Sequence, residues 1–204
     1  MNRITQPQIA ECPYGASHRQ GLRLKSYWAL VIMLWGLLAG GNPVHTAPVV
    51  AEEHLVKSAF IYNFAKFIEW PSGAFADSAA PLVLGVLGHD PMQTALKSVA
   101  GKMIGTHPLV IKAAASNESL SACHMLFISG AEHANLASIL NRLGHRPVLT
   151  IGDSEGYARK GVIINLVKAR GKIRFQINLE AAKRCGLNIS SKLLKLATIV
   201  KGRP

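Results

Sequence analysis

The chain has 204 residues, 49% of them hydrophobic, which is enough for one domain with a buried core and excludes a disordered or fibrous protein. Its 23 Lys and Arg residues outnumber its 11 Asp and Glu residues, so the formal net charge is +12 at pH 7. No helix-turn-helix, RNP or zinc-finger pattern accompanies this charge, and we therefore expect no nucleic acid as a partner. An anionic membrane surface, an acidic protein partner and simple solubility are all consistent with it.

The first 51 residues have the composition of a secretory signal peptide. Basic residues precede a charge-free apolar run at residues 27–39, and helix-breaking and small residues follow it. As a helix this run would span only ~20 Å, which is less than the ~30 Å hydrocarbon core of a membrane. We therefore expect cleavage near Ala51 and a periplasmic domain over residues 52–204. An uncleaved N-terminal anchor is the alternative.

Apolar residues with a helical period extend from His54 to Trp70 and predict the first helix of this domain. The segment is rich in aromatic residues, and Pro71 is expected to end it. Tyr62 and Trp70 lie outside the apolar arc, and the pattern assigns them no role. The residues expected on the buried face are Val56, Phe60, Ile61, Phe64, Phe67 and Ile68.

Short apolar runs alternate with helical segments in the middle of the chain. Helices are expected at residues 92–99 and 132–143, between strands that read as continuous apolar runs. This alternation over short connections predicts an α/β fold: a single compact Rossmann-like domain with a mostly parallel sheet flanked by helices. The expected strands are residues 81–88, 107–113, 123–129 and 146–153.

The C-terminal part predicts a β-hairpin followed by two helical segments. Residues 161–167 and 172–178 form the hairpin, and in the second strand apolar and polar residues alternate, so that one face is buried. The first helical segment ends at Gly186, a favourable residue for a helix C-terminus. The final helix is expected to begin after Ser190 as N-cap and to continue toward Val200.

The sequence contains no motif for catalysis or for binding a cofactor or a metal. It lacks the G-x-S-x-G, H-E-x-x-H and Walker patterns, and no G-x-G-x-x-G follows a strand. We therefore predict a binding protein that is not an enzyme and has no cofactor.

Cys123 and Cys185 are the two cysteines of the expected mature chain. An even number in an oxidising compartment predicts a disulfide, and two buried thiols are the alternative. Because the two positions are 62 apart in the sequence (185 minus 123), such a disulfide would contribute about 4 kcal/mol to stability.

The segment GDSEGYARKG, residues 152–161, is the candidate interface. It is polar and Gly-rich and lies between a strand and the hairpin, and such loops carry recognition more often than packing. We expect Tyr157 to be an aromatic anchor beside two cations, with the polar face of the hairpin next to it. A solvated turn with Tyr157 packed on the sheet edge is the alternative. The residues of this predicted partner-binding surface are Tyr157, Arg159, Lys160, Arg174 and Gln176.

Four segments of the chain resemble the YfiR family of periplasmic proteins. They are VKSAFIYNFAKFIEWP (56–71), CHMLFIS (123–129), TIGDSEGYARKGVIINLV (150–167) and KIRFQINLEAAKRCGLNISSKLLKLATIV (172–200). The resemblance spans about His54 to Lys201, and it implies a compact Rossmann-like domain that forms a dimer. Cys123 matches a family cysteine, but the usual partner of that cysteine is missing, since Pro81 and Leu82 occupy its region.

The resemblance implies a regulatory function. A YfiR-like protein represses an inner-membrane diguanylate cyclase, YfiN, by binding its periplasmic sensor domain, and this lowers cyclic-di-GMP signalling. It is itself sequestered by an outer-membrane lipoprotein, YfiB. A periplasmic module that binds a small molecule and signals to another membrane receptor is the competing function.

Overall fold

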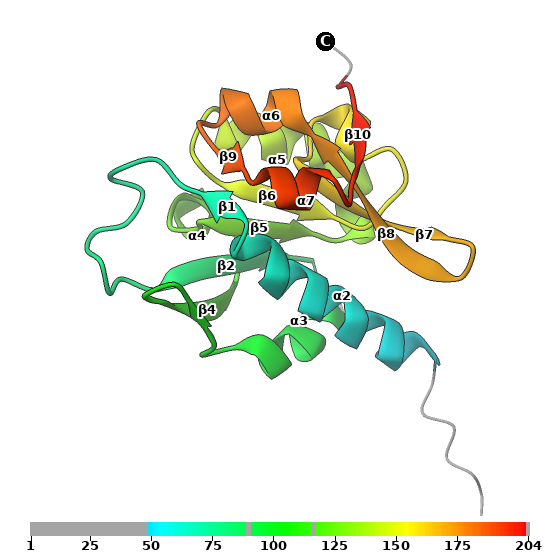
Figure 1. The fold of residues 1–204 in the computed structure, drawn as a ribbon, viewed down its shortest axis with the longest axis horizontal. Helices are drawn as coiled ribbons and strands as arrows, with labels where there is room; N and C mark the ends of the chain where they lie inside the picture. Colours follow the sequence, from blue (N-terminus) through cyan, green and yellow to red (C-terminus); the bar gives the residue numbers. More distant parts are fainter. Residues whose placement is uncertain (1–48, 89–90, 116, 203–204) are drawn as a thin grey trace, which may run out of the picture. The chain divides into compact units, whose positions relative to one another are not determined.

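The computed structural model describes residues 49–88, 91–115 and 117–202 (Figure 1). Most of the expected signal peptide therefore lies outside the described residues. The expected cleavage position, Ala51, falls in the first turn of helix α2 (Val49–Ala65). Within the described ranges, no helix is long and apolar enough to cross a membrane.

An eight-stranded mixed sheet forms the centre of the fold, and its order is β10-β8-β7-β6-β5-β2-β4-β3 (Figure 1). Neighbouring strands are parallel except in the pairs β3–β4 and β7–β8. The predicted α/β class and the predicted hairpin are therefore confirmed. The strands are β2 (Leu82–Leu87), β3 (Met103–Ile104), β4 (His107–Ala113), β5 (Met125–Ile128), β6 (Leu149–Gly152), β7 (Ile164–Ala169), β8 (Lys172–Asn178) and β10 (Thr198–Val200).

Helices cover both faces of this sheet and divide the core into two clusters. The first cluster lies under α2, α3, α6 and α7, and the second lies under α4 and α5. The sheet lies between the two clusters, and its central strands β2 and β5 are buried along their whole length. The shorter helices are α3 (Pro91–Leu96), η1 (Lys97–Val99), α4 (Asn117–Ser121), η2 (Gly130–Asn135), α5 (Leu136–Leu143), η3 (Ala158–Lys160), α6 (Leu179–Arg184) and α7 (Ser191–Leu194).

Helix α2 ends earlier than the sequence pattern predicts. It stops at Ala65, and a two-stranded sheet follows, in which β1 (Ile68–Glu69) pairs antiparallel with β9 (Asn188–Ile189). The Phe67 carbonyl accepts a hydrogen bond from the Ser190 amide at 2.9 Å, so the chain leaves the helix to pair with a distant segment. Val56, expected to be buried, is 41% exposed.

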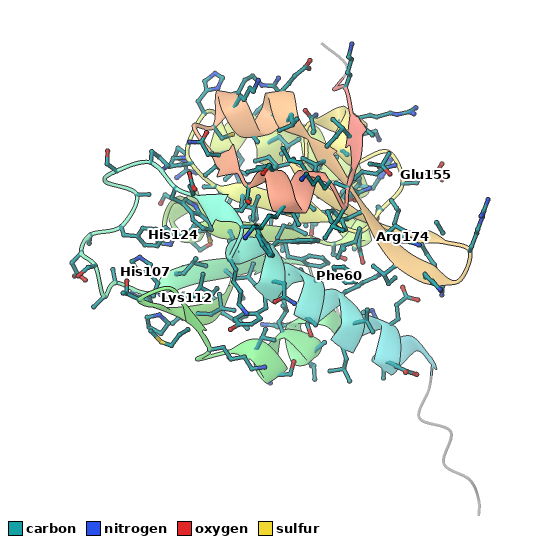
Figure 2. All side chains as sticks on the ribbon, in the orientation of Figure 1. Phe60, His107, Lys112, His124, Glu155 and Arg174 are labelled. Carbon is teal, nitrogen blue, oxygen red and sulfur yellow. The ribbon has the colours of Figure 1, made fainter. Side chains whose placement is uncertain are left out.

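The aromatic side chains without a predicted role fasten α2 and its following loop. The Tyr62 hydroxyl donates to the Met103 carbonyl at 3.1 Å, and Trp70 packs edge-on against Phe75 at a centroid distance of 5.9 Å. The Phe75 ring in turn stacks against the rings of His107 and His124, with centroid distances of 3.9 and 4.4 Å. Figure 2 labels these two histidines. This stack holds the loop after β1 against the amino end of the sheet.

The C-terminal segment also differs from the prediction. Ser190 is confirmed as an N-cap, since its hydroxyl accepts from the Lys192 amide, but α7 ends at Leu194 and strand β10 follows. Thr198, Ile199 and Val200 are β-branched, which favours a strand, and the edge of β8 is available for pairing.

The predicted disulfide is not present, and both cysteines are free. The Cys123 sulfur lies over Gly85 of β2 within the second core cluster, whereas Cys185 packs against the first. The two thiols therefore belong to opposite faces of the sheet. Burial raises the pKa of both thiols, which keeps them protonated.

Candidate partner-binding surface

The candidate surface is built on the loop that follows β6. Residues 153–157 lead from β6 into η3, and the loop covers Asn165 of β7, whose amide nitrogen donates to the Ser154 carbonyl at 2.8 Å. At the start of η3 the Asn178 amide nitrogen donates to the Ala158 carbonyl, also at 2.8 Å. Buried amide side chains of the hairpin therefore fix both ends of the loop.

A partly buried ion-pair network joins this loop to α2 and to the hairpin. The Lys57 ammonium lies 2.9 Å from Asp153 and 3.1 Å from Glu53, and Glu53 also binds Lys168 of β7 at 2.8 Å. Burial lowers the pKa of Lys57, but hydrogen bonds and attraction from Asp153 and Glu53 outweigh it, so the pKa is raised. Hydrogen bonds, first from Lys168 and then from Lys57, lower the pKa of Glu53. Lys57 and Glu53 therefore stay charged near neutral pH, and the network holds Asp153 at the carboxyl end of the sheet.

Tyr157 is not an exposed anchor, and that prediction is wrong. Its side chain is fully buried in the second core cluster, and its hydroxyl donates to the Ser129 carbonyl at 3.1 Å. Gly152 has no side chain where the tyrosine ring lies, so the ring fills that space. The ring also stacks under His133, with 5.6 Å between centroids. Tyr157 therefore supports the surface from below, which is close to the alternative left open by the sequence.

Arg159 and Lys160 are exposed and line a groove of about 520 Å³ between η3 and the start of α5. The Lys160 ammonium lies 2.9 Å from Nε2 of His133, so the imidazole accepts a hydrogen bond from it. The groove therefore combines an apolar floor with a basic rim. Its lining residues are His133, Ala134, Leu136, Ala137, Gly156, Arg159 and Lys160.

The hairpin residues of the predicted surface lie at different distances from this groove. Gln176 pairs with Asn165 across the strands, and because Asn165 binds the loop, Gln176 is on the loop's side of the sheet. Arg174 pairs with Val167 and is exposed on the hairpin, which extends away from the centre of the sheet (Figure 2). The structure thus brings Arg159 and Lys160 together, with Gln176 beside their loop and Arg174 farther out.

Two residues of this site, His133 and Asn165, were not identified from the sequence. His133 gave no local signal, because its role depends on η2 meeting η3 in space. Asn165 did give one, since a polar residue interrupts an apolar run. Its Oδ1 is the buried side-chain oxygen that lacks a hydrogen-bond partner among the described residues, an arrangement that costs stability. Across residues 49–88, 91–115 and 117–202, no three His, Cys, Asp or Glu side chains are grouped so that they could hold a metal ion.

Comparison with solved structures finds a similarity to a conserved domain protein from Vibrio cholerae O1 biovar El Tor strain N16961, with a TM-score of 0.46 and 14% identity. The match covers 72% of this chain and 60% of that chain, so the present chain matches less than two thirds of that protein's length. A search of curated proteins finds no match.

A comparison with protein families gives a broader match. The YfiR/HmsC-like family matches residues 54–198, which is nearly the whole of the described domain. This match contains almost all of the four segments on which the resemblance to YfiR rests. The chain therefore belongs to the YfiR/HmsC-like family.

Proposed function

We propose that this chain is a periplasmic regulator that binds the periplasmic sensor domain of a membrane-bound, YfiN-like diguanylate cyclase and thereby lowers cyclic-di-GMP synthesis. The observation that carries the proposal is the family match over residues 54–198. The YfiR/HmsC-like family is periplasmic and regulatory, and it acts in cyclic-di-GMP signalling through membrane signalling proteins. The function is therefore one of binding rather than of catalysis.

The proposal extends to the other partners that the sequence resemblance implies. A YfiB-like lipoprotein of the outer membrane would relieve the inhibition by sequestering the regulator. The regulator itself would act as a homodimer after export and cleavage near Ala51. Both partners would meet a basic protein, since residues 52–204 contain 19 Lys and Arg against 10 Asp and Glu.

We assign the cyclase contact to the groove of Arg159 and Lys160, together with Gln176 and Arg174 of the hairpin. The apolar floor of the groove offers contact area, and its basic rim favours an acidic segment of the partner. The loop that carries the two cations is held by the Asp153 ion pair, so little ordering of that loop is needed on binding.

The test is a binding measurement between the purified protein and the purified periplasmic domain of a membrane diguanylate cyclase whose gene neighbours its own. Calorimetry should show a complex, and the double charge reversal Arg159→Glu/Lys160→Glu should weaken it at least about tenfold at low salt. The matched control is Lys97→Glu/Lys102→Glu, two exposed cations near the β3 edge of the sheet.

Two results would count against the proposal at different levels. If the folded wild-type protein does not bind the cyclase domain, the regulatory partner is wrong. If Arg159→Glu/Lys160→Glu binds the cyclase domain as tightly as the wild type and the control do, the partner stands and the groove is the wrong surface. Binding of a small molecule is the second candidate function, and a cavity elsewhere in the fold favours it.

A further inference from the structure

A second cavity lies at the carboxyl ends of β2 and β4; it borders the same helical segment as the groove, η2 and α5, but shares no lining residue with it. β2 is the first strand of the large sheet in the chain, and the chain places β4 on one side of it and β5 on the other. This reversal puts the topological switch point between β2 and β5, where α/β sheets usually bind ligands, and the cavity borders it through the end of β2 and through η2, which follows β5. The cavity has a volume of about 450 Å³, which is in the range of small-molecule sites.

One wall of the cavity is formed by small and apolar residues. Val86 and Leu87 end β2, and residues 113–115 at the end of β4 are all alanines. Gly88 follows β2 with a φ of +93°, a conformation that favours glycine, and it adds no side chain to the wall. Among the described residues, this wall therefore offers backbone and methyl groups to a ligand and no charged side chain.

The opposite wall carries a row of polar side chains on η2 and α5. Its members are three or four residues apart, so they share one face of the helical segment. Glu132 is at the amino end, where its carboxylate accepts from the Asn135 amide at 3.0 Å. Arg142 is at the other end. The row consists of Glu132, Asn135, Ser138 and Arg142.

The two charges of this row have opposite sign and lie far apart. Glu132 and Arg142 are ten positions apart (142 minus 132), which corresponds to roughly 15 to 17 Å along the axis of η2 and α5. An extended peptide advances ~3.3 Å per residue, so three residues span about 10 Å. A charge-assisted contact of ~2.8 Å at each end extends this reach to about 15 Å. Amide and hydroxyl groups between the charges can bond to the polar groups of such a chain.

We propose that this cavity binds a short zwitterionic peptide of about three residues, with its amino group at Glu132 and its carboxylate at Arg142. The guanidinium offers paired donors to a carboxylate, and the anionic Glu132 is an acceptor for an ammonium. The alanine wall would contact the peptide's side chains and select small ones. The site does not involve the proposed cyclase contact, so each can fail without the other.

The test uses tri-alanine and two blocked forms as calorimetric probes with the purified full chain. N-acetyl-tri-alanine lacks the ammonium, and tri-alanine amide lacks the carboxylate. The free peptide should bind, and each blocked form should bind about tenfold more weakly, as expected for the loss of one charge-assisted contact.

Variants assign each charge to its end of the cavity. In Arg142→Gln the amide form should bind as well as the free peptide, and in Glu132→Gln the acetylated form should do so. Arg142 is exposed and Glu132 half-buried, so both variants should fold. The control Arg170→Gln, an exposed cation in the hairpin turn, should keep the wild-type preference for the free peptide.

Several results would overturn the assignment. One is the absence of tri-alanine binding at millimolar concentrations. Another is equal binding of free and blocked peptides to the wild type. A third is an unchanged preference in both variants, which would place the peptide elsewhere.

Discussion

The partly buried ion pair between Lys57 and Asp153 gives a prediction whose size follows from the structure. Lys57→Met keeps the length and the apolar stem of the side chain but removes the ammonium that contacts Asp153 at 2.9 Å. The two side chains are only 11% and 12% exposed, so the carboxylate of Asp153 would remain poorly solvated and unpaired. Glu53 is affected less, because it keeps its contact with Lys168.

Removing one partner of a buried pair costs about 3 to 5 kcal/mol. We expect the lower end, about 3 kcal/mol in the free energy of unfolding, because both side chains keep some contact with water. The double variant Lys57→Met/Asp153→Asn should lose less stability than Lys57→Met alone, since no unpaired charge remains. Lys168→Met removes a cation that is 56% exposed and should cost less than about 1 kcal/mol.

Urea unfolding measured by circular dichroism gives these free energies directly. The reasoning fails if Lys57→Met unfolds within about 1 kcal/mol of the wild type, or if the double variant is no more stable than the single one. Either result would mean that the ion pair does not hold the loop after β6.

Three further predictions concern the other buried polar groups. Tyr157→Ala should cost about 3 to 5 kcal/mol of unfolding free energy, whereas Tyr157→Phe should cost about 1 kcal/mol and leave partner binding intact. Burial, with a smaller contribution from His107, lowers the pKa of His124 and outweighs the hydrogen bond to the Ala74 carbonyl, which raises it. Its Nδ1 accepts from the Val83 amide at 3.1 Å, so protonation is disfavoured in the folded state. The free energy of unfolding should therefore be highest above pH 6.5, which is about the pKa of histidine in the unfolded chain, and should fall as the pH drops below it. His124→Asn should flatten this pH dependence. Cys123 and Cys185 should both titrate as thiols in unfolded protein prepared without reductant.

Each of these has an outcome that would contradict it. For the tyrosine, it is a stable Tyr157→Ala variant with impaired binding, the behaviour of a surface residue. For the histidine, it is a stability that does not change between pH 7 and 5, with His145→Gln as the exposed control. For the cysteines, it is a titration that detects neither thiol in the unfolded protein before reductant is added and both thiols afterwards.

The central strands could be predicted from the sequence because each is a continuous apolar run. All six residues of β2 are buried, and burial of this kind on both faces leaves a local signature. The pairing of β1 with β9 has no such signature, since Ile68 and Ile189 meet only in the folded chain. Because the helical period of apolar residues continues through Ile68, the sequence predicts a helix that extends beyond Ala65, where α2 ends.

The candidate site divides in the same way. The exposure of Arg159 and Lys160 follows from a polar, Gly-rich segment, and the sequence predicts it. The burial of Tyr157 does not follow, because the space for its ring arises from the missing side chain of Gly152, and its hydroxyl finds an acceptor in the carbonyl of Ser129, which follows β5. The disulfide prediction failed because the sequence does not tell on which face of the sheet Cys123 and Cys185 lie.

The most direct test of the regulatory account is the cellular level of cyclic-di-GMP after deletion of the gene. We expect the level and biofilm formation to rise, and wild-type protein supplied in the periplasm to restore them. Folded Arg159→Glu/Lys160→Glu protein at equal abundance should not restore them. An unchanged cyclic-di-GMP level in the deletion strain, under conditions in which the cyclase is made, would contradict the account.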